Sequence, residues 1–550
     1  MEGMSITAGP RPGTGLLDRS RTVAGPGFNR WLVPPAALAI HLCIGMAYGL
    51  SVFWLPMTRL VGLTQSRACG PEVGLLQALT VTGCDWRVSD VSWTFTIAIV
   101  ALGSSAAIWG GWLERAGPRK AGVAAALCWC GGLLLGAVGV ALHQLWLLWL
   151  GLGALGGIGL GIGYISPVST LIKWFPDRRG MATGMAIMGF GGGALIGAPL
   201  ADKLINAFHT PTSTGVAECL AAMAGIYLVF MLAGAFGYRV PPANWTPEGW
   251  TAPAGKTNAL ITRRHVHLQD AHKTLSFWMI WAVLCLNVSA GIGVLALASP
   301  MLQEIFGGSL IGQPGTKFAG LDDGQRRAVA AVAAGFVGLL SLFNIGGRFV
   351  WASLSDRIGR KVTYSIFFAL GILLYASAPW AAHAGSKALF VAMCCAILTM
   401  YGGGFATVPA YLADVFGTQF VGAIHGRLLT AWSTAGVIGP VLVTYIREAQ
   451  IGAGVPRETA YDVTLYVLAG LLAAGFVTNL LVRPLAERRF MSDDRVAELQ
   501  GGAATAATGG SFGIGRGGLD GRAALAWMAV GLPILWGVSI TLQKTIVLFQ

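Results

Sequence analysis

Charged residues are scarce in this sequence: Asp, Glu, Lys and Arg make up only 11% of its 550 residues. Soluble globular domains carry about 25% charged residues, so this scarcity excludes an ordinary water-soluble protein. Hydrophobic residues account for 55% of the chain, and its mean hydropathy is +0.65. Such a composition indicates an all-α protein that crosses a membrane many times.

Motifs of catalysis and of cofactor binding are also missing. The chain has no Walker A loop, which argues against ATP-driven chemistry, and no CxxC pair or metal cluster. A G-x-G-x-x-G run occurs at residues 151–156, but it lies in an apolar segment, where close helix packing explains it. We therefore expect no enzyme activity, no metal and no cofactor.

Twelve apolar runs of membrane-spanning length lie between residues 31 and 482. They cover residues 31–57, 90–113, 121–142, 144–172, 180–204, 218–238, 275–303, 327–351, 362–382, 387–413, 421–446 and 459–482. A later apolar run predicts a thirteenth span. The expected organisation is a tail (1–30), a six-helix half (31–238), a linker (239–274), a second six-helix half (275–483), a flexible linker (484–522) and the extra span (523–543).

Lys and Arg outnumber Asp and Glu by 37 to 24, and their distribution is uneven. About 22 of them fall in the tails and alternate loops of one side, and about 10 on the other, which is the positive-inside pattern. It predicts a cytoplasmic N-terminus, so that the thirteenth span would leave the C-terminus outside. The positive charge then reflects membrane topology, and we expect a lipid bilayer rather than nucleic acid as the partner.

Two of the nine cysteines, Cys69 and Cys84, lie in the first loop on the predicted outer side. An oxidising compartment there permits a disulfide between them. Most of the other cysteines lie inside apolar runs, where Cys packs as a small hydrophobe.

The two halves repeat with one offset of 242 residues. Three pairs share it: Glu114 with Asp356, Pro167 with Pro409, and Gly184 with Gly426. Parallel six-span halves are a transporter architecture, with the substrate site at the midplane between them.

The repeated loop carries an acidic residue, an arginine and further basic residues. The first copy contains Glu114 and Arg115, and the second contains Asp356, Arg357 and Arg360. A carboxylate at a helix end can bind such cations across a cytoplasmic helix interface, and so act as a gating latch. The alternative is an ordinary basic loop on the cytoplasmic side.

The second copy resembles the signature loop of the major facilitator superfamily, G-x-L-x-D-R-x-G-R-K, except for its first residue, Ala352. In the first copy, Glu114 replaces Asp and Pro118 intrudes. A narrower resemblance lies in residues 161–180, which end in K-W-F-P-D-R-R-G, and in residues 401–405, Y-G-G-G-F. These motifs are similar to those of the oxalate/formate antiporter family, and the resemblance covers roughly residues 31–482. It implies the major facilitator fold of two six-helix halves.

Arg348 lies eight residues before Asp356, which is about 12 Å along a helix and well inside the membrane core. An ionisable residue at that depth is a functional hypothesis by default, although its side chain can also extend to the cytoplasmic interface. The guanidinium fork suits a carboxylate. By resemblance, related monocarboxylate transporters have an acidic residue four positions earlier, where this chain has Asn344.

The resemblance also points to a missing cation. Oxalate-handling members of the family have a Lys in the eleventh helix, and Trp432 occupies that position here. One cation balances one carboxylate, and a second, unpaired carboxylate would cost several kcal/mol in a low-dielectric cavity. A monocarboxylate is therefore favoured over oxalate.

Aromatic residues are the remaining candidates for the binding pocket: Tyr48, Tyr164, Tyr401 and Phe405. A Tyr hydroxyl can donate to a carboxylate while the ring excludes water; each ring alone is more often packing. His41 and His425 lie within spans and are candidates for proton coupling, with core packing as the alternative.

The sequence thus predicts a secondary transporter of a small organic anion such as formate, lactate or pyruvate, with oxalate left open. It would work by alternating access, as an antiporter or a proton-linked symporter, and as a functional monomer in a bacterial cytoplasmic membrane. The alternatives are a transporter of another solute class, since fold does not fix function, and a membrane sensor that binds a carboxylate without carrying it.

Overall fold

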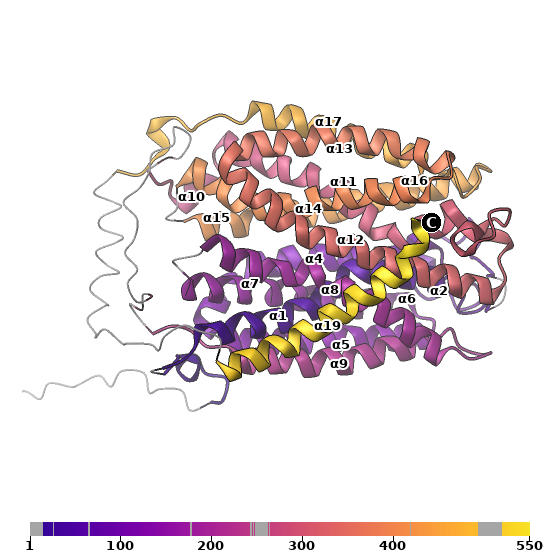
Figure 1. The fold of residues 1–550 in the computed structure, drawn as a ribbon, viewed down its shortest axis with the longest axis horizontal. Helices are drawn as coiled ribbons and strands as arrows, with labels where there is room; N and C mark the ends of the chain where they lie inside the picture. Colours follow the sequence, from indigo (N-terminus) through magenta and orange to yellow (C-terminus); the bar gives the residue numbers. More distant parts are fainter. Residues whose placement is uncertain are drawn as a thin grey trace, which may run out of the picture.

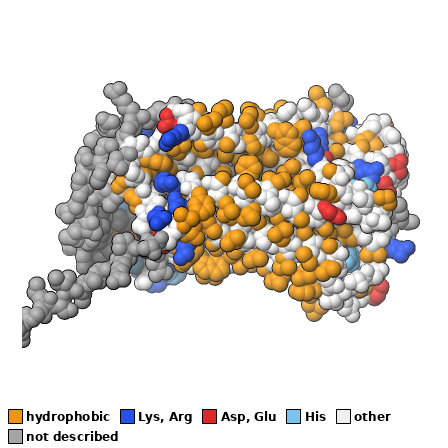
Figure 2. All heavy atoms as spheres, turned by 90° about the horizontal axis from the view of Figure 1, so that it is seen from below, with side chains coloured by type: hydrophobic (Ala, Val, Ile, Leu, Met, Phe, Trp, Pro, Cys, Tyr) orange, Lys and Arg blue, Asp and Glu red, His pale blue; other side chains and the backbone are white. Residues whose placement is uncertain are grey.

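The structure is a computed structural model that describes residues 15–549 apart from 26, 64–65, 176–178, 243–244, 246, 248–261, 263, 418–419 and 493–519. Within these residues it is helical, with isolated bridges but no strand. Twelve helical segments of the described part, the C-terminal segment Gly521–Leu548 among them, are long and apolar enough to cross a membrane. Figure 2 shows hydrophobic side chains covering the middle of one face, with charged side chains toward its two ends. The prediction of an all-α membrane protein is confirmed.

The helices form two groups that lie one above the other in Figure 1. The first half contains α1 (Val33–Ile44), a 3-10 segment (Gly45–Phe53), α2 (Trp54–Met57), α3 (Leu75–Ala78), α4 (Val88–Ala116), α5 (Pro118–Ala141), α6 (Leu145–Leu148), a π-helical segment (Trp149–Leu155), α7 (Gly156–Trp174), α8 (Arg179–Phe208) and α9 (Val216–Gly237). The second half contains α10 (Leu268–Ala271), α11 (Leu275–Phe306), α12 (Asp323–Ile358), α13 (Arg360–His383), α14 (Lys387–Phe416), α15 (Val421–Leu428), α16 (Thr430–Gly452) and α17 (Asp462–Leu481).

The helix boundaries repeat between the halves. α5 and α13 begin at residues 118 and 360 and end at 141 and 383, which is the offset of 242 found in the sequence. The glycines that connect them to the preceding helices, Gly117 and Gly359, have φ angles of +86° and +89°. Only glycine adopts this left-handed region without strain, so the same tight turn is encoded twice.

We call the two ends of the bundle the linker end and the disulfide end. The linker end holds the α4–α5 and α12–α13 turns and the described residues at the two ends of the segment that joins the halves. The disulfide end holds the loop in which Cys69 and Cys84 form a disulfide. Several helices run further than the predicted spans toward this end; α11, for example, continues to Phe306 rather than ending at 303.

The halves contact each other along different pairs of helices. α4 packs on α16, where Ser92 Oγ lies 3.3 Å from Thr444 Oγ1. α8 packs on α12, where the Ser341 hydroxyl donates to the Gly191 carbonyl. In α11, Pro300 has no N–H to donate to the carbonyl of residue 296, and the Trp54 indole N–H from the other half donates to that carbonyl at 2.7 Å.

The extra helix predicted at the C-terminus is present as α19 (Gly521–Thr545). In Figure 1 it is the yellow helix that crosses the front of the first half and ends beside the second half. It contacts both α8 and α12. Lys544 forms an ion pair with Asp202 of α8, and Thr541 packs against Gly338 of α12. α19 therefore fills the space between α8 and α12 toward the disulfide end.

Candidate functional site

Arg348 lies in the middle of the bundle, in α12. Arg348 is only 2% exposed, so its side chain does not extend to the membrane surface. The guanidinium Nε donates to Asn344 Oδ1 at 3.2 Å, and the guanidinium carbon lies 5.6 Å from the centre of the Phe405 ring. Glycine makes room for it, because a Cβ at Gly191 in α8 would lie 3.0 Å from this Nε. The Gly-rich segment of α8 thus lets the two halves approach each other at the cation.

Three buried donors at and beside Arg348 have no acceptor in the described part of the chain. Among the described residues, Arg348 Nη1, Asn344 Nδ2 and Trp432 Nε1 are buried without a hydrogen-bond partner. No carboxylate of the described residues forms an ion pair with Arg348. Leaving a buried donor unsatisfied costs about 1–3 kcal/mol. These donors suit a ligand that accepts several hydrogen bonds and carries negative charge, such as a carboxylate.

Aromatic rings from both halves surround the cation. The predicted residues Tyr48, Tyr164, Tyr401, Phe405 and Trp432 are each at most 3% exposed. Their ring centres form a connected set: Phe405 to Trp432 4.7 Å, Tyr401 to Phe405 5.3 Å, Tyr164 to Trp432 5.4 Å and Tyr48 to Tyr401 5.8 Å. The structure therefore brings together all seven residues proposed for substrate binding. We call these seven residues the central cluster.

One hydrogen bond joins the halves inside the central cluster. Tyr401 Oη of α14 donates to Tyr48 Oη of the first half at 2.8 Å. Arg348 lies within electrostatic reach of the hydroxyls of Tyr48 and Tyr164. A carboxylate bound at Arg348 would thus meet hydroxyl donors from the opposite half.

Phe190, which is not among the residues predicted from the sequence, belongs to the same group of rings. It is fully buried and lies 5.0 Å from Tyr48, 5.3 Å from Tyr164 and 5.6 Å from Trp432, between ring centres. Its position between the glycines of residues 189–193 was the available signal, because small neighbours let a large ring approach adjacent helices.

The two histidine candidates lie in different surroundings. His41 is buried, its Nε2 lies 3.1 Å from the Tyr164 carbonyl oxygen, and its ring stacks on Tyr164 at 5.6 Å. His41 therefore packs behind a ring of the central cluster. His425 lies in α15, toward the linker end, and its Nε2 is buried without a partner among the described residues.

The gating candidates lie at the linker end. Arg360 contacts Asp356 and approaches Asp414 of α14 at 3.8 Å, so this group connects three helices of the second half. Arg357 is exposed. Glu114 and Arg115 end α4, and their side chains lie outside the described residues. In the described part, the acidic-basic contacts of this loop stay within one half.

A second buried charge cluster lies at the disulfide end and was missed in the sequence, because Glu304 follows the predicted end of its span. Glu304 accepts bonds from Arg447, from Arg457 at 2.7 Å and from the Tyr461 hydroxyl at 2.7 Å. Arg447 and Glu304 are almost completely buried. The cluster connects α11, α16 and the segment that precedes α17.

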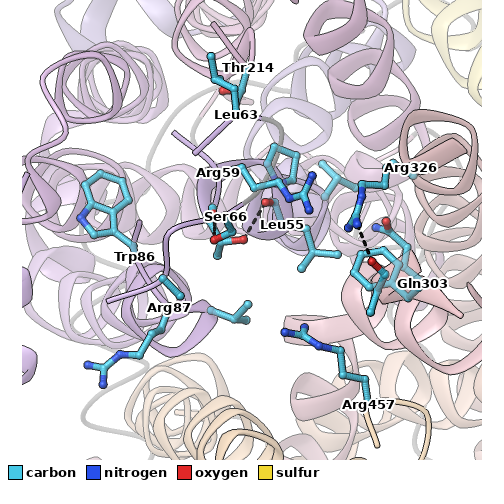
Figure 3. Close-up of a pocket in the computed structure, with 18 of the residues that line it drawn as sticks. Leu55, Arg59, Leu63, Ser66, Trp86, Arg87, Thr214, Gln303, Arg326 and Arg457 are labelled. Atoms are coloured by element: carbon cyan, nitrogen blue, oxygen red, sulfur yellow. Dashed lines mark hydrogen bonds between the residues drawn. The ribbon is translucent and has the colours of Figure 1, made fainter. Parts of the chain in front are cut away.

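A cavity of about 690 Å³ opens between the halves at this same end (Figure 3). Its lining includes Val52, four residues after Tyr48 in the 3-10 segment, but no residue of the central cluster. The cavity therefore ends close to the central cluster, which is itself closed over by side chains.

Comparison with known proteins supports this architecture. The chain matches the model of the Major Facilitator Superfamily over residues 37–440. It is 27% identical over 414 residues to the oxalate:formate antiporter of Oxalobacter formigenes, which covers 74% of this chain and 87% of that protein. It is 25% identical over 480 residues to apicoplast pyruvate carrier 1 of Toxoplasma gondii, covering 76% and 84%. Human monocarboxylate transporter 11 is 29% identical over 211 residues, 38% of each chain.

Among solved structures, a bacterial homologue of the human lysosomal transporter Spinster, in an inward-facing and unoccupied conformation, matches with a TM-score of 0.55. The alignment covers 84% of this chain and 98% of that one at 14% identity, so it shows the fold alone. The family and these relatives are transporters rather than enzymes. The family model covers most of the chain, and the fold is that of a multi-pass membrane protein with two repeated six-helix halves. This chain therefore belongs to the major facilitator superfamily.

Proposed function

We propose that this protein carries a small monocarboxylate, such as formate, lactate or pyruvate, across the cytoplasmic membrane by alternating access. The central cluster supports the proposal, since one buried cation and unpaired donors suit one carboxylate. The names of the relatives point to the same substrate class: oxalate and formate, pyruvate, and monocarboxylates.

In this proposal Arg348 binds the carboxylate. Its free Nη1, with Asn344 Nδ2 and Trp432 Nε1, supplies donors to the two carboxylate oxygens. The rings of Tyr164 and Phe405 exclude water from the pair, which strengthens the interaction because the local dielectric is low. Uncharged walls leave a second carboxylate group unpaired, and this disfavours oxalate.

Exchange of one anion for another is the favoured coupling mode. A proton-carrying acid beside the cation would support proton symport, but no described Asp or Glu pairs with Arg348. If the central cluster were empty, the charge of Arg348 would be uncompensated inside the membrane. The transporter therefore returns more easily to its other side-facing state with a second anion bound.

For the orientation, we propose that the linker end faces the cytoplasm, because the basic tails and loops gather there. A single exposed cysteine introduced at Arg488, near the start of the predicted flexible linker, should react with a membrane-impermeant maleimide only after the cells are opened.

The test of the binding role is uptake of labelled formate, lactate, pyruvate and oxalate into proteoliposomes, with and without a pH gradient. Arg348→Ala should lower monocarboxylate uptake at least a hundredfold, because a buried charge-assisted pair is lost, and Arg348→Lys should retain a small fraction. Arg488→Ala removes an exposed cation and should leave uptake unchanged. Full activity of Arg348→Ala would contradict the proposal, and binding without flux would indicate a sensor instead.

A further inference from the structure

Arginines outnumber acidic residues in the lining of the cavity at the disulfide end. Six arginines line it, against three acidic residues: Arg59, Arg87, Arg326, Arg327, Arg447 and Arg457, with Asp202, Asp323 and Glu448. Outside the lining, Lys544, Glu304 and Asp90 are direct ion-pair partners, and the charges of Asp85 and Asp322 act on Arg59 and Arg326. A concave, partly desolvated space with this charge attracts anions.

Arg457 carries one of the charges that is not balanced. Glu304 is neutralised by Arg447, which binds it through two guanidinium nitrogens. Arg457 adds a second guanidinium to the same carboxylate, and its side chain is 44% exposed. Arg447 and Arg457 thus share one carboxylate, and Arg457 faces the cavity (Figure 3).

Arg59 and Arg326 both lie near Asp323, and each has a second acid nearby, Asp85 for Arg59 and Asp322 for Arg326. Arg59 Nη1 lies 3.5 Å from Asp323 Oδ1, a long ion pair between the two halves. Arg326 is held in place by the carbonyls of Leu321 at 2.7 Å and Ala319 at 3.0 Å. Both guanidinium groups face the space between the halves in Figure 3.

The charges of these groups act on one another. Burial lowers the pKa of Arg59, the charges of Asp323 and Asp85 raise it, and the nearby charge of Arg457 lowers it. Cations that destabilise each other in a common space are stabilised by an anion between them.

We propose that Arg59, Arg326 and Arg457 form a second anion site, which takes a small carboxylate at the mouth of the cavity before it reaches Arg348. Hereafter we call it the outer anion site. It rests on the proposed function for its ligand class. The site draws on both halves: Arg59 follows α2, whereas Arg326 and Arg457 belong to the second half. Val52, which lines the same cavity, lies about 8 Å along a 3-10 helix from Tyr48, so the cavity leads from the outer anion site toward the central cluster.

Two predictions separate this site from the central one. First, purified Arg348→Ala protein should still bind formate weakly in saturation-transfer NMR at low ionic strength, and this signal should fade with added salt because cavity charges are screened. Adding Arg457→Gln or Arg59→Gln to that variant should remove at least three quarters of the signal. Lys317→Gln is the matched control, because it removes an exposed cation at the same end, outside the cavity lining.

Second, Arg457→Gln and Arg59→Gln alone should raise the KM for monocarboxylate uptake about three- to tenfold and leave the maximal rate within twofold. Arg457→Gln leaves Glu304 bound to Arg447 and Tyr461, so the fold should persist. No formate signal in Arg348→Ala protein, or a signal that the two substitutions leave unchanged, would overturn the outer anion site. The proposed function fails by a different result, full transport by Arg348→Ala.

Discussion

In the proposed function, single side chains of the central cluster decide which anion fits. There Arg348 supplies the charge and Trp432 limits how much more charge is tolerated, since by resemblance it stands where oxalate-handling members of the family have a lysine. Trp432 is 1% exposed, and its ring contacts Phe405, Tyr164 and Phe190. The space of a second cation is thus filled by a neutral ring, and selectivity follows from charge count and volume together.

Trp432→Lys should shift selectivity toward dicarboxylates. The ammonium would stand across the central cluster from Arg348 and balance a second carboxylate. We expect oxalate uptake in proteoliposomes to rise at least tenfold relative to formate uptake. Trp432→Met removes the ring without adding charge and serves as the control; an equal gain with Met would mean that space, not charge, excludes oxalate.

At the scale of helices, α19 is the element that the family resemblance does not cover. Its buried residues form a narrow stripe of mostly small side chains: Ala523, Val530, Gly537, Thr541 and Thr545. Bulky residues such as Leu525, Leu532 and Leu535 are more than 60% exposed on its other face. Small residues allow close helix packing in a membrane, whereas the bulky face suits lipid. α19 is therefore built to dock on α8 and α12 by one side only.

The docking of α19 should depend on one ion pair and two glycines. A Cβ at Gly338 would lie 2.3 Å from Thr541 Oγ1, and one at Gly335 would lie 2.7 Å from Lys544 Cβ. Gly338→Val and Lys544→Ala should therefore lower the hydrogen-exchange protection of residues 521–545, with little change in α4 or α16. Gln543→Ala alters an exposed neighbour and should change nothing. Unaltered protection in Gly338→Val would show that α19 is held elsewhere.

The Glu304 cluster should matter more for stability than exposed ion pairs do. Glu304→Gln leaves Arg447 buried with an uncharged partner, and breaking a buried pair costs about 3–5 kcal/mol. Glu458 pairs with Lys317 at 3.4 Å on the surface, where a pair contributes about 0–1 kcal/mol. Thermal unfolding in detergent should therefore show a clear loss of stability for Glu304→Gln and almost none for Glu458→Gln. Equal melting temperatures would contradict the buried-pair account.

At the scale of the whole molecule, transport by two packed halves requires them to move against each other. The halves are joined through α4 and α16, where the hydroxyls of Ser92 and Thr444 are 3.3 Å apart. Cysteines at both positions should form a disulfide on oxidation and stop uptake, and a reductant should restore it. Each single cysteine variant and the unmodified protein, treated alike, control for the native Cys69–Cys84 bond. Full uptake by the cross-linked protein would exclude a rocking motion at this interface.

The sequence determined what local composition and spacing determine: the membrane class from hydropathy, the two halves from the offset of 242 residues, and the depth of Arg348 from helix geometry. Phe190 and the Glu304 cluster needed the tertiary structure, because their partners are up to 242 residues away and lie on other helices. The place of α19 between α8 and α12, and the convergence of Arg59, Arg326 and Arg457 on one cavity, were likewise decided by packing between elements. Hydrophobic periodicity and charge determine whether a segment spans the membrane. A cluster of arginines or of unpaired donors exists only after distant segments have packed together.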